Sequence, residues 1–127
     1  MILYHFCAAH MLQSILRSGI TLGHLVEPSG KMTGDHQWLT SDKNPDNQSW
    51  ATRGLIGYDR TAYRLTVNIP DSRHRKLHLA RCYLSSHPIE TIEFLLDGWS
   101  GSNDWYIYTG KIPPRWIVGY KKMRERN

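Results

Sequence analysis

The chain has 127 residues, a length that predicts a single domain spanning residues 1–127. Hydrophobic residues make up 40% of the sequence and charged residues 21%, which argues against a disordered chain. The net charge of +5 favours an acidic partner, such as DNA, RNA, a nucleotide or an acidic protein surface.

The sequence has no apolar run long enough to cross a bilayer, and its first residues lack the basic and long apolar segments of a signal peptide. We therefore expect a cytoplasmic protein without a membrane partner. In that reducing compartment Cys7 and Cys82 are expected to be free thiols and small core residues.

The N-terminal part predicts a strand, a helix and a turn. Residues 2–6 have the composition of a short strand. The apolar residues that follow recur at helical spacing, and Gly19 stands where a helix C-cap glycine is expected. Residues 20–22 then predict a brief second strand.

The middle of the chain predicts loops around two strands. Glycine, proline and polar residues predict a flexible loop over 27–35, which leads into a short strand at 37–40. Residues 43–49 predict a surface loop, whereas the glycines of 50–59 permit either a loop or a short ribbon. Strict alternation makes residues 61–69 the clearest strand.

The C-terminal part predicts two helices and two strands. Residues 73–83 predict a basic helix, and residues 90–97 a second helix that ends at Gly98. A strand is expected from residue 104 to the turn at 109–110, and a last strand follows the prolines at 113–114. These elements predict an α+β fold with few helices, built on a small bent antiparallel sheet or split β-barrel.

The strand that begins at Asp104 is the first candidate for a site. Side chains alternate between the two faces of a strand, so Asp104, Tyr106 and Tyr108 are expected on one face and Trp105 and Ile107 on the other. One face would then pack in the core and the other would form the wall of a site.

Three stretches together resemble a known superfamily. The first reads Leu3-Tyr4-His5-Phe6-Cys7 and precedes a helix that ends in Ile15-Leu16-Arg17-Ser18-Gly19-Ile20. The second is Trp38-Leu39-Thr40-Ser41-Asp42, and the third is Asp104-Trp105-Tyr106-Ile107-Tyr108 with Ile112-Pro113-Pro114. They resemble the ADP-ribosyltransferase-like superfamily, and more narrowly its small microbial and phage members and the DNA-modifying toxins of the DarT type.

The resemblance implies an NAD-binding domain that transfers ADP-ribose to a macromolecule. It implies that His5, beside Tyr4, hydrogen-bonds a ribose of NAD, and that the segment with Trp38, Thr40 and Ser41 packs by the nicotinamide. Asp104 matches the late-strand acid that stabilises the sugar cation, although the superfamily normally has glutamate there.

Further roles are expected around this set. Tyr106 would stack on a ring or position the acceptor. An arginine is expected at the pyrophosphate, where guanidinium makes bidentate contacts. Arg53, Arg60 and Arg64 are candidates, and Arg64 is favoured because a strand fixes its direction. Glu90 and Glu93 compete with Asp104 as the acid.

A metal site is the weaker alternative for the histidines of the expected basic helix. His74, His78 and Cys82 are spaced i, i+4 and i+8, which would place them on one helix face. At 1.5 Å per residue they would span about 12 Å, too far for one zinc ion. We therefore expect no metal.

Other functions remain open at this point. The basic residues of 73–83, near Tyr83 and Trp99, could contact single-stranded nucleic acid. A catalytically inactive module that binds a nucleotide or a partner on the same fold is the main alternative, for example a phage-type inhibitor of a host protein. An RNA 2′-phosphotransferase on a related fold fits less well, because its spaced histidine and arginines find no match.

Overall fold

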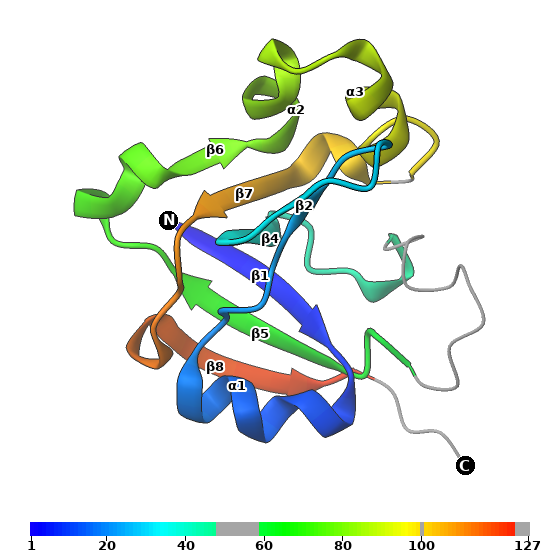
Figure 1. Ribbon diagram of the computed structural model, residues 1–127. Coiled ribbons are helices and arrows are strands. Elements are labelled where there is room, and N and C mark those ends of the chain that lie inside the picture. Colours follow the sequence, from blue (N-terminus) through cyan, green and yellow to red (C-terminus); the bar gives the residue numbers. More distant parts are fainter. Residues whose placement is uncertain (48–58, 100, 124–127) are drawn as a thin grey trace.

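The computed structural model describes residues 1–47, 59–99 and 101–123 (Figure 1). Its main element is a six-stranded antiparallel sheet with the order β6-β7-β4-β1-β5-β8. These strands are β1 (Ile2–Cys7), β4 (His36–Thr40), β5 (Tyr63–Asn68), β6 (Leu77–Leu79), β7 (Trp105–Thr109) and β8 (Ile117–Lys122). The α+β class is confirmed, and the sheet is open, with edges at β6 and β8.

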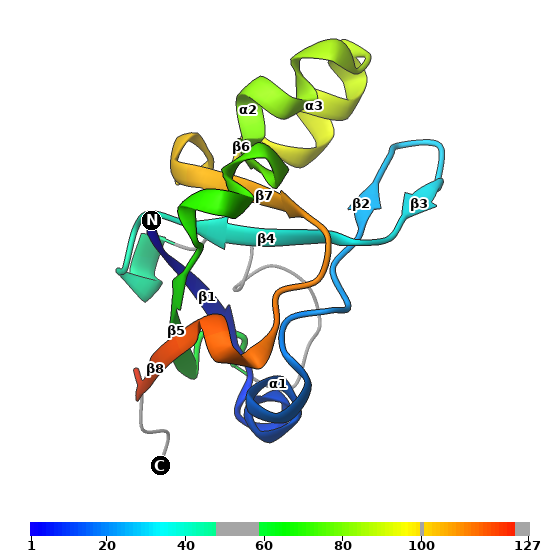
Figure 2. The same ribbon diagram turned by 90° about the vertical axis from the view of Figure 1, so that its left-hand side faces the viewer.

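The sheet consists of two halves that meet at one point. In one half β1 pairs with β5 along its whole length, and in the other β4 pairs with β7 along its whole length. Between the halves, β1 and β4 share only one registered pair, Tyr4 and Thr40. Beyond that pair the two strands diverge (Figure 2), so the sheet is split at its centre.

The first hydrophobic core lies between the sheet and helix α1 (Leu12–Ser18). Leu12 and Ile15 of the helix are buried against Leu65 of β5 and Leu39 of β4. The helix ends at Gly19, which has a φ of 87° and donates its N–H to the Ile15 carbonyl at 2.7 Å. The expected helix and its glycine cap are thus confirmed.

The second core covers the other face of β4 and β7. Helices α2 (Ala80–Tyr83) and α3 (Ile89–Leu95) pack there, at the top of Figure 1. Trp105 and Ile107 belong to this core, whereas Tyr108 is buried in the first one and Tyr106 packs against it. The expected alternation along β7 is therefore confirmed.

Asp104 precedes the strand instead of opening it. It ends the 3-10 turn η6 (Ser102–Asp104), and its side chain is exposed. Its backbone N–H donates to the Gly101 carbonyl at 3.0 Å, which closes the turn. The expectation that Asp104 shares a strand face with Tyr106 is therefore wrong.

The expected basic helix over 73–83 is also wrong. The segment forms the 3-10 helix η4 (Asp71–Lys76), then β6, then α2. β6 pairs with β7, and the Thr109 hydroxyl donates to the Lys76 carbonyl at 3.2 Å. Pairing with a neighbouring strand thus outweighs the helical preference of the local sequence.

Smaller differences concern the loops. The expected loop over 27–35 forms the turn and second strand of a hairpin, in which β3 (Met32–Thr33) pairs with β2 (Leu25–Val26) just before the loop; the hairpin projects from the sheet (Figure 2). The expected strand at 20–22 is reduced to a single bridge between Ile20 and Ile112. The surface loop includes the 3-10 turn η2 (Pro45–Asn47).

The chain closes with the 3-10 turn η7 (Pro114–Trp116) before β8, and further 3-10 turns occur at η1 (Ala9–Met11) and η5 (Leu84–Ser86). The undecided ribbon or loop at 50–59 lies largely outside the described residues. Among the described helices, none has the length and apolar character needed to cross a membrane.

Candidate functional site

A cleft of about 610 Å³ opens where β1 and β4 diverge. Its walls come from β1, Met11 and Ile15 of the first helical segment, β4, Arg60 before β5, the end of α3 and the first residue of β7. The lining is mainly apolar and rich in aromatic side chains. These aromatic residues are Tyr4, Phe6, Trp38, Phe94, Trp99 and Trp105.

Two tryptophans of adjacent strands fix the shape of the cleft wall. The rings of Trp38 and Trp105 meet edge to face, with centroids 6.0 Å apart and an interplanar angle of 86°. The Trp38 indole N–H donates to the His24 carbonyl at 3.0 Å, which holds that ring in place. Rings arranged in this way offer flat surfaces on which a planar ligand can stack.

His5 is a polar residue of the cleft lining. Its Nδ1 lies 2.9 Å from the Trp38 carbonyl oxygen. A carbonyl only accepts hydrogen bonds, so Nδ1 carries the proton and Nε2 of the neutral ring is an acceptor. Burial lowers the pKa of His5 below 6.5, which favours this neutral form at pH 7.

A second, smaller cavity adjoins the cleft at His5. It has a volume of about 250 Å³ and shares Trp38, Met11 and Ile15 with the cleft. Its own lining includes the hydroxyl residues Ser14, Ser18 and Thr21. His5 thus stands between an aromatic compartment and a more polar one.

Four of the residues expected from the sequence line the cleft together. They are Tyr4, His5, Trp38 and Thr40, and Arg60, one of the three candidate arginines, lines the cleft as well. The Thr40 hydroxyl oxygen also accepts a hydrogen bond from the Asp42 N–H at 3.0 Å, which fixes the turn after β4.

Ser41 and Asp104 lie next to each other outside the cleft lining. The Ser41 N–H donates to the Asp104 carbonyl at 3.0 Å, and both side chains are exposed. Thr40 pairs with Trp105, and both line the cleft. Ser41 is the residue after Thr40 and Asp104 the residue before Trp105, so both lie at the rim of the cleft. Asp104 is therefore close to the cleft along the chain, without contributing to its wall.

Two further expected residues are engaged elsewhere. Arg64 donates from Nη1 to the Lys43 carbonyl at 3.0 Å, and its guanidinium carbon lies 5.2 Å from the centroid of the Tyr4 ring. Tyr106 points to the opposite face, against the first core. Arg53 lies outside the described residues.

The described lining of the cleft contains no carboxylate. Glu90 and Glu93, the competing acids, are exposed on α3. Burial raises the pKa of the Cys7 thiol to about 11, so this cleft residue is a thiol and not a nucleophilic thiolate near neutral pH. The cleft wall itself is thus suited to binding.

Several cleft residues were not expected from the sequence. Phe94 of α3 is half exposed at the cleft, and Trp99 follows the same helix. Phe6 and Trp105 complete the aromatic wall. A hydrophobic residue left exposed on a short helix is a signal of this kind of site, but it is recognised only once the helix is placed.

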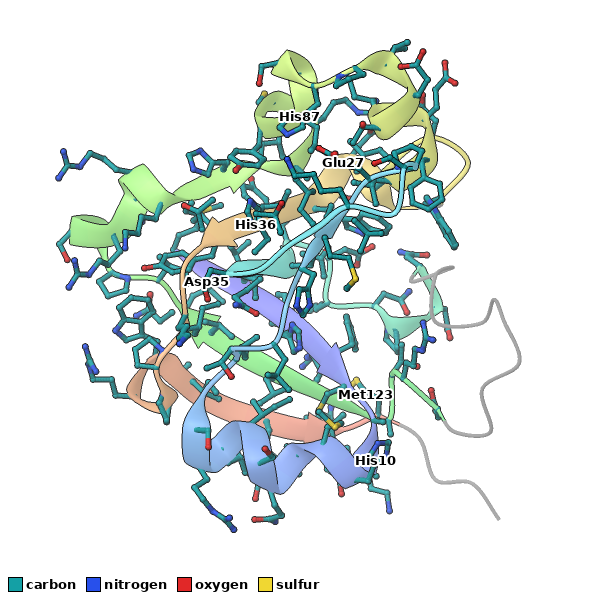
Figure 3. All side chains as sticks on the ribbon, viewed as in Figure 1. His10, Glu27, Asp35, His36, His87 and Met123 are labelled. Atoms are coloured by element: carbon teal, nitrogen blue, oxygen red, sulfur yellow. The ribbon has the colours of Figure 1, made fainter. Side chains whose placement is uncertain are left out.

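The histidines considered for a metal do not share one face. His74, His78 and Cys82 fall in η4, β6 and α2 respectively, and no group of three metal-ligating residues occurs among the described residues. Both cysteines are free, as expected, but Cys82 is exposed and is not a core residue. Figure 3 labels His36 of β4 and His87, and the Tyr83 hydroxyl of α2 lies 2.9 Å from Nε2 of His36.

Comparison with known proteins adds no family. No protein-family model matches the chain, and no curated protein is significantly similar to it.

Proposed function

We propose that this protein is an NAD-dependent ADP-ribosyltransferase with an ADP-ribosyltransferase-like fold, whose NAD site is the cleft at the split of the sheet. The observation that carries the proposal is the convergence of Tyr4, His5, Trp38 and Thr40 on one cleft. These residues belong to the first two motifs that resemble the superfamily, and the pairing of Tyr4 in β1 with Thr40 in β4 brings the motifs together.

Binding would use the aromatic wall and His5. A planar ring of NAD would stack against the tryptophans, where aromatic surfaces are already fixed edge to face. The Nε2 acceptor of His5 would receive a hydrogen bond from a ribose hydroxyl. A cleft of about 610 Å³ falls within the range usual for small-molecule sites.

In the reaction, the bond between ribose C1′ and the nicotinamide nitrogen breaks, and nicotinamide leaves with the bonding electrons. A nucleophile of the acceptor forms the new bond to C1′. Asp104 at the rim would stabilise the positive charge that develops on the sugar and take up the proton of the nucleophile. For this, the ribose must extend from the cleft to the rim.

The proposed acceptor is a macromolecule, either a nucleic-acid base or a protein side chain. The net charge of +5 favours approach to DNA, RNA or an acidic protein surface. The exposed residues Arg73, Arg75 and Lys76 of η4 contribute to this charge.

A second candidate is a nucleotide-binding module without transferase activity. It is favoured by the lack of a carboxylate in the described cleft lining and by the exposure of Asp104. A carboxylate that is exposed to water stabilises a developing charge less than one in a dry site.

The test is incubation of the purified protein with labelled NAD and, separately, DNA, RNA and cell extract. Release of nicotinamide and label on a macromolecule are expected, together with a thermal shift by NAD. NAD binding without release would favour the binding module, and neither binding nor release would refute both.

Asp104→Ala tests the acid. It is expected to remove turnover, while NAD affinity and the midpoint of unfolding stay at the wild-type values, because the side chain is exposed. Asp71→Ala is the matched control, since the Asp71 side chain is 98% exposed and lies on η4, outside the cleft lining. Wild-type turnover in Asp104→Ala would remove Asp104 from the mechanism.

A further inference from the structure

β8 forms the longer of the two open edges of the sheet. Among the described strands it pairs only with β5, so one side of its backbone faces outward (Figure 2). The other edge, β6, has three residues and lies between η4 and α2. The outward N–H and C=O groups of an edge strand can pair with a further strand. β8 is therefore the edge with room for one.

Two large apolar side chains are exposed on this strand. Val118 is 59% exposed and Tyr120 is 56% exposed. The register between β5 and β8 shifts next to Val118, which leaves this residue without a registered partner on β5. The Tyr120 ring lies beside the Tyr63 ring, with centroids 6.3 Å apart. An incoming strand would cover these side chains and remove apolar surface from water.

The charge along this edge is basic, and the neighbouring strand does not neutralise it. Lys121 lies directly opposite Arg64 in the register of β5 and β8. Like charges in this position repel each other, and no ion pair joins Lys121 to a described residue. Arg115, just before β8, is exposed as well, and the sequence has no acidic residue from 105 to 124. A carboxylate beside Lys121 would supply the missing opposite charge.

A second copy of the chain does not supply that charge. If two copies of β8 paired antiparallel, the start of each strand would lie beside the end of the other, so Arg115 of one copy would approach Lys121 of the other. In a parallel pair in register, the two copies of Lys121 would lie side by side. Like charges repel in both arrangements, which favours a different chain with acidic residues.

We propose that β8 binds an extended, acidic segment of another protein, which adds as a further strand and places carboxylates next to Lys121 and apolar side chains next to Tyr120. Side chains alternate between the two faces of a strand, so a segment of alternating acidic and apolar residues would meet both. β8 contributes no residue to the described lining of the cleft, so this inference goes beyond the proposed function and does not depend on it.

The test uses synthetic eight-residue peptides with blocked ends, and binding is followed by calorimetry and by backbone amide NMR shifts. One peptide alternates valine and glutamate, and a second alternates valine and lysine. The glutamate peptide is expected to bind with a Kd of about 0.1 mM, because an interface of one short strand is weak and transient. Its NMR shifts should be confined to β8 and β5. The lysine peptide is expected not to bind.

Two further peptides test whether the segment adds as a strand. They have the glutamate sequence with N-methyl groups on one or the other set of alternate backbone amides. Only one set of amides faces β8, and N-methylation of that set removes its hydrogen bonds. At least one of the two peptides should therefore bind about tenfold more weakly than the unmethylated peptide.

Three variants test the residues. Lys121→Glu reverses the charge at an exposed position, so it should weaken binding of the glutamate peptide roughly tenfold and allow the lysine peptide to bind. Tyr120→Thr should weaken binding of the glutamate peptide about two- to fivefold. Lys31→Glu is the matched control, because it makes the same charge change in the β2–β3 hairpin, which projects away from β8 (Figure 2). It should bind both peptides like the wild type.

Several results would overturn the proposal. Equal binding of the glutamate and lysine peptides, or no binding of either at millimolar concentration, would refute the match of charge. If both methylated peptides bind like the unmethylated one, the segment does not add as a strand. A dimer in sedimentation that Tyr120→Thr dissociates would show that a second copy occupies the edge. All these measurements are made without NAD, so their failure leaves the proposed function standing.

Discussion

His5 gives a prediction about pH that can be worked from its surroundings. Burial lowers its pKa in the folded protein, whereas the unfolded chain has the ordinary value of about 6.5. As the pH falls through 6.5, His5 therefore binds a proton in the unfolded state but not in the folded state. The free energy of unfolding should fall by up to about 1.4 kcal/mol per pH unit until the lowered folded pKa is reached.

The variant that isolates this effect is His5→Asn. Its side-chain amide can still donate to the Trp38 carbonyl, but it does not titrate. We expect urea unfolding between pH 8 and pH 5 to show a shallower loss of stability in His5→Asn than in the wild type, with the difference developing below pH 6.5. His24→Asn, at an exposed loop residue, is the control and should keep the wild-type slope. Parallel curves for wild type and His5→Asn would refute the reasoning.

Two further predictions concern the packing that supports the cleft. Gln37→Leu should lower the free energy of unfolding in urea by about 2 kcal/mol. The buried Gln37 side chain accepts from the Gly23 N–H at 2.8 Å and donates to the Gly110 carbonyl at 2.9 Å, and leaving each of these two half-buried backbone groups without its partner costs about 1 kcal/mol. Wild-type stability would show that water replaces both hydrogen bonds. Gly23→Ala should lower the free energy of unfolding by about 1–3 kcal/mol, because the added Cβ would lie 2.1 Å from the His36 carbonyl oxygen. Gly34→Ala, with open space around its Cβ, is the control and should leave the stability unchanged. Equal midpoints of urea unfolding for the two variants would contradict the close approach at Gly23.

The elements that were predicted correctly from the sequence have their signal in their own residues. In β5 the alternation of Tyr63, Leu65 and Val67 with polar residues matches a sheet with one buried face. In α1 the helical spacing of apolar residues and the glycine cap are both local signals. Such patterns are visible without knowledge of the neighbouring chain.

β6 shows why other elements were missed. Its residues Leu77, His78 and Leu79 alternate, but the run is three residues long and lies between basic residues that favour a helix. The strand exists because β7 offers a free edge: Leu77 pairs with Tyr108, and Leu79 with Tyr106. This edge depends on the tertiary arrangement and leaves no local signal.

The residues of the candidate site also fall into those that a local motif indicates and those that it does not. Motifs predicted that Tyr4, His5, Trp38 and Thr40 belong together, and they do line one cleft. Phe94 and Trp99 reach the cleft only because α3 packs over β7, and nothing in their local sequence indicates this. Arg64, expected at the pyrophosphate, donates to the Lys43 carbonyl and lies over the Tyr4 ring, and its strand position alone does not indicate these two contacts.

The split of the sheet links the fold to the proposed chemistry. Where β1 and β4 diverge, their backbone groups no longer pair with each other, and the Trp38 carbonyl is instead satisfied by Nδ1 of His5. The same hydrogen bond holds the ring across the split and leaves its Nε2 as an acceptor. His5 thus replaces a missing backbone hydrogen bond between the strands. The same side chain is well placed to bind a ligand in the cleft that opens where that hydrogen bond is missing.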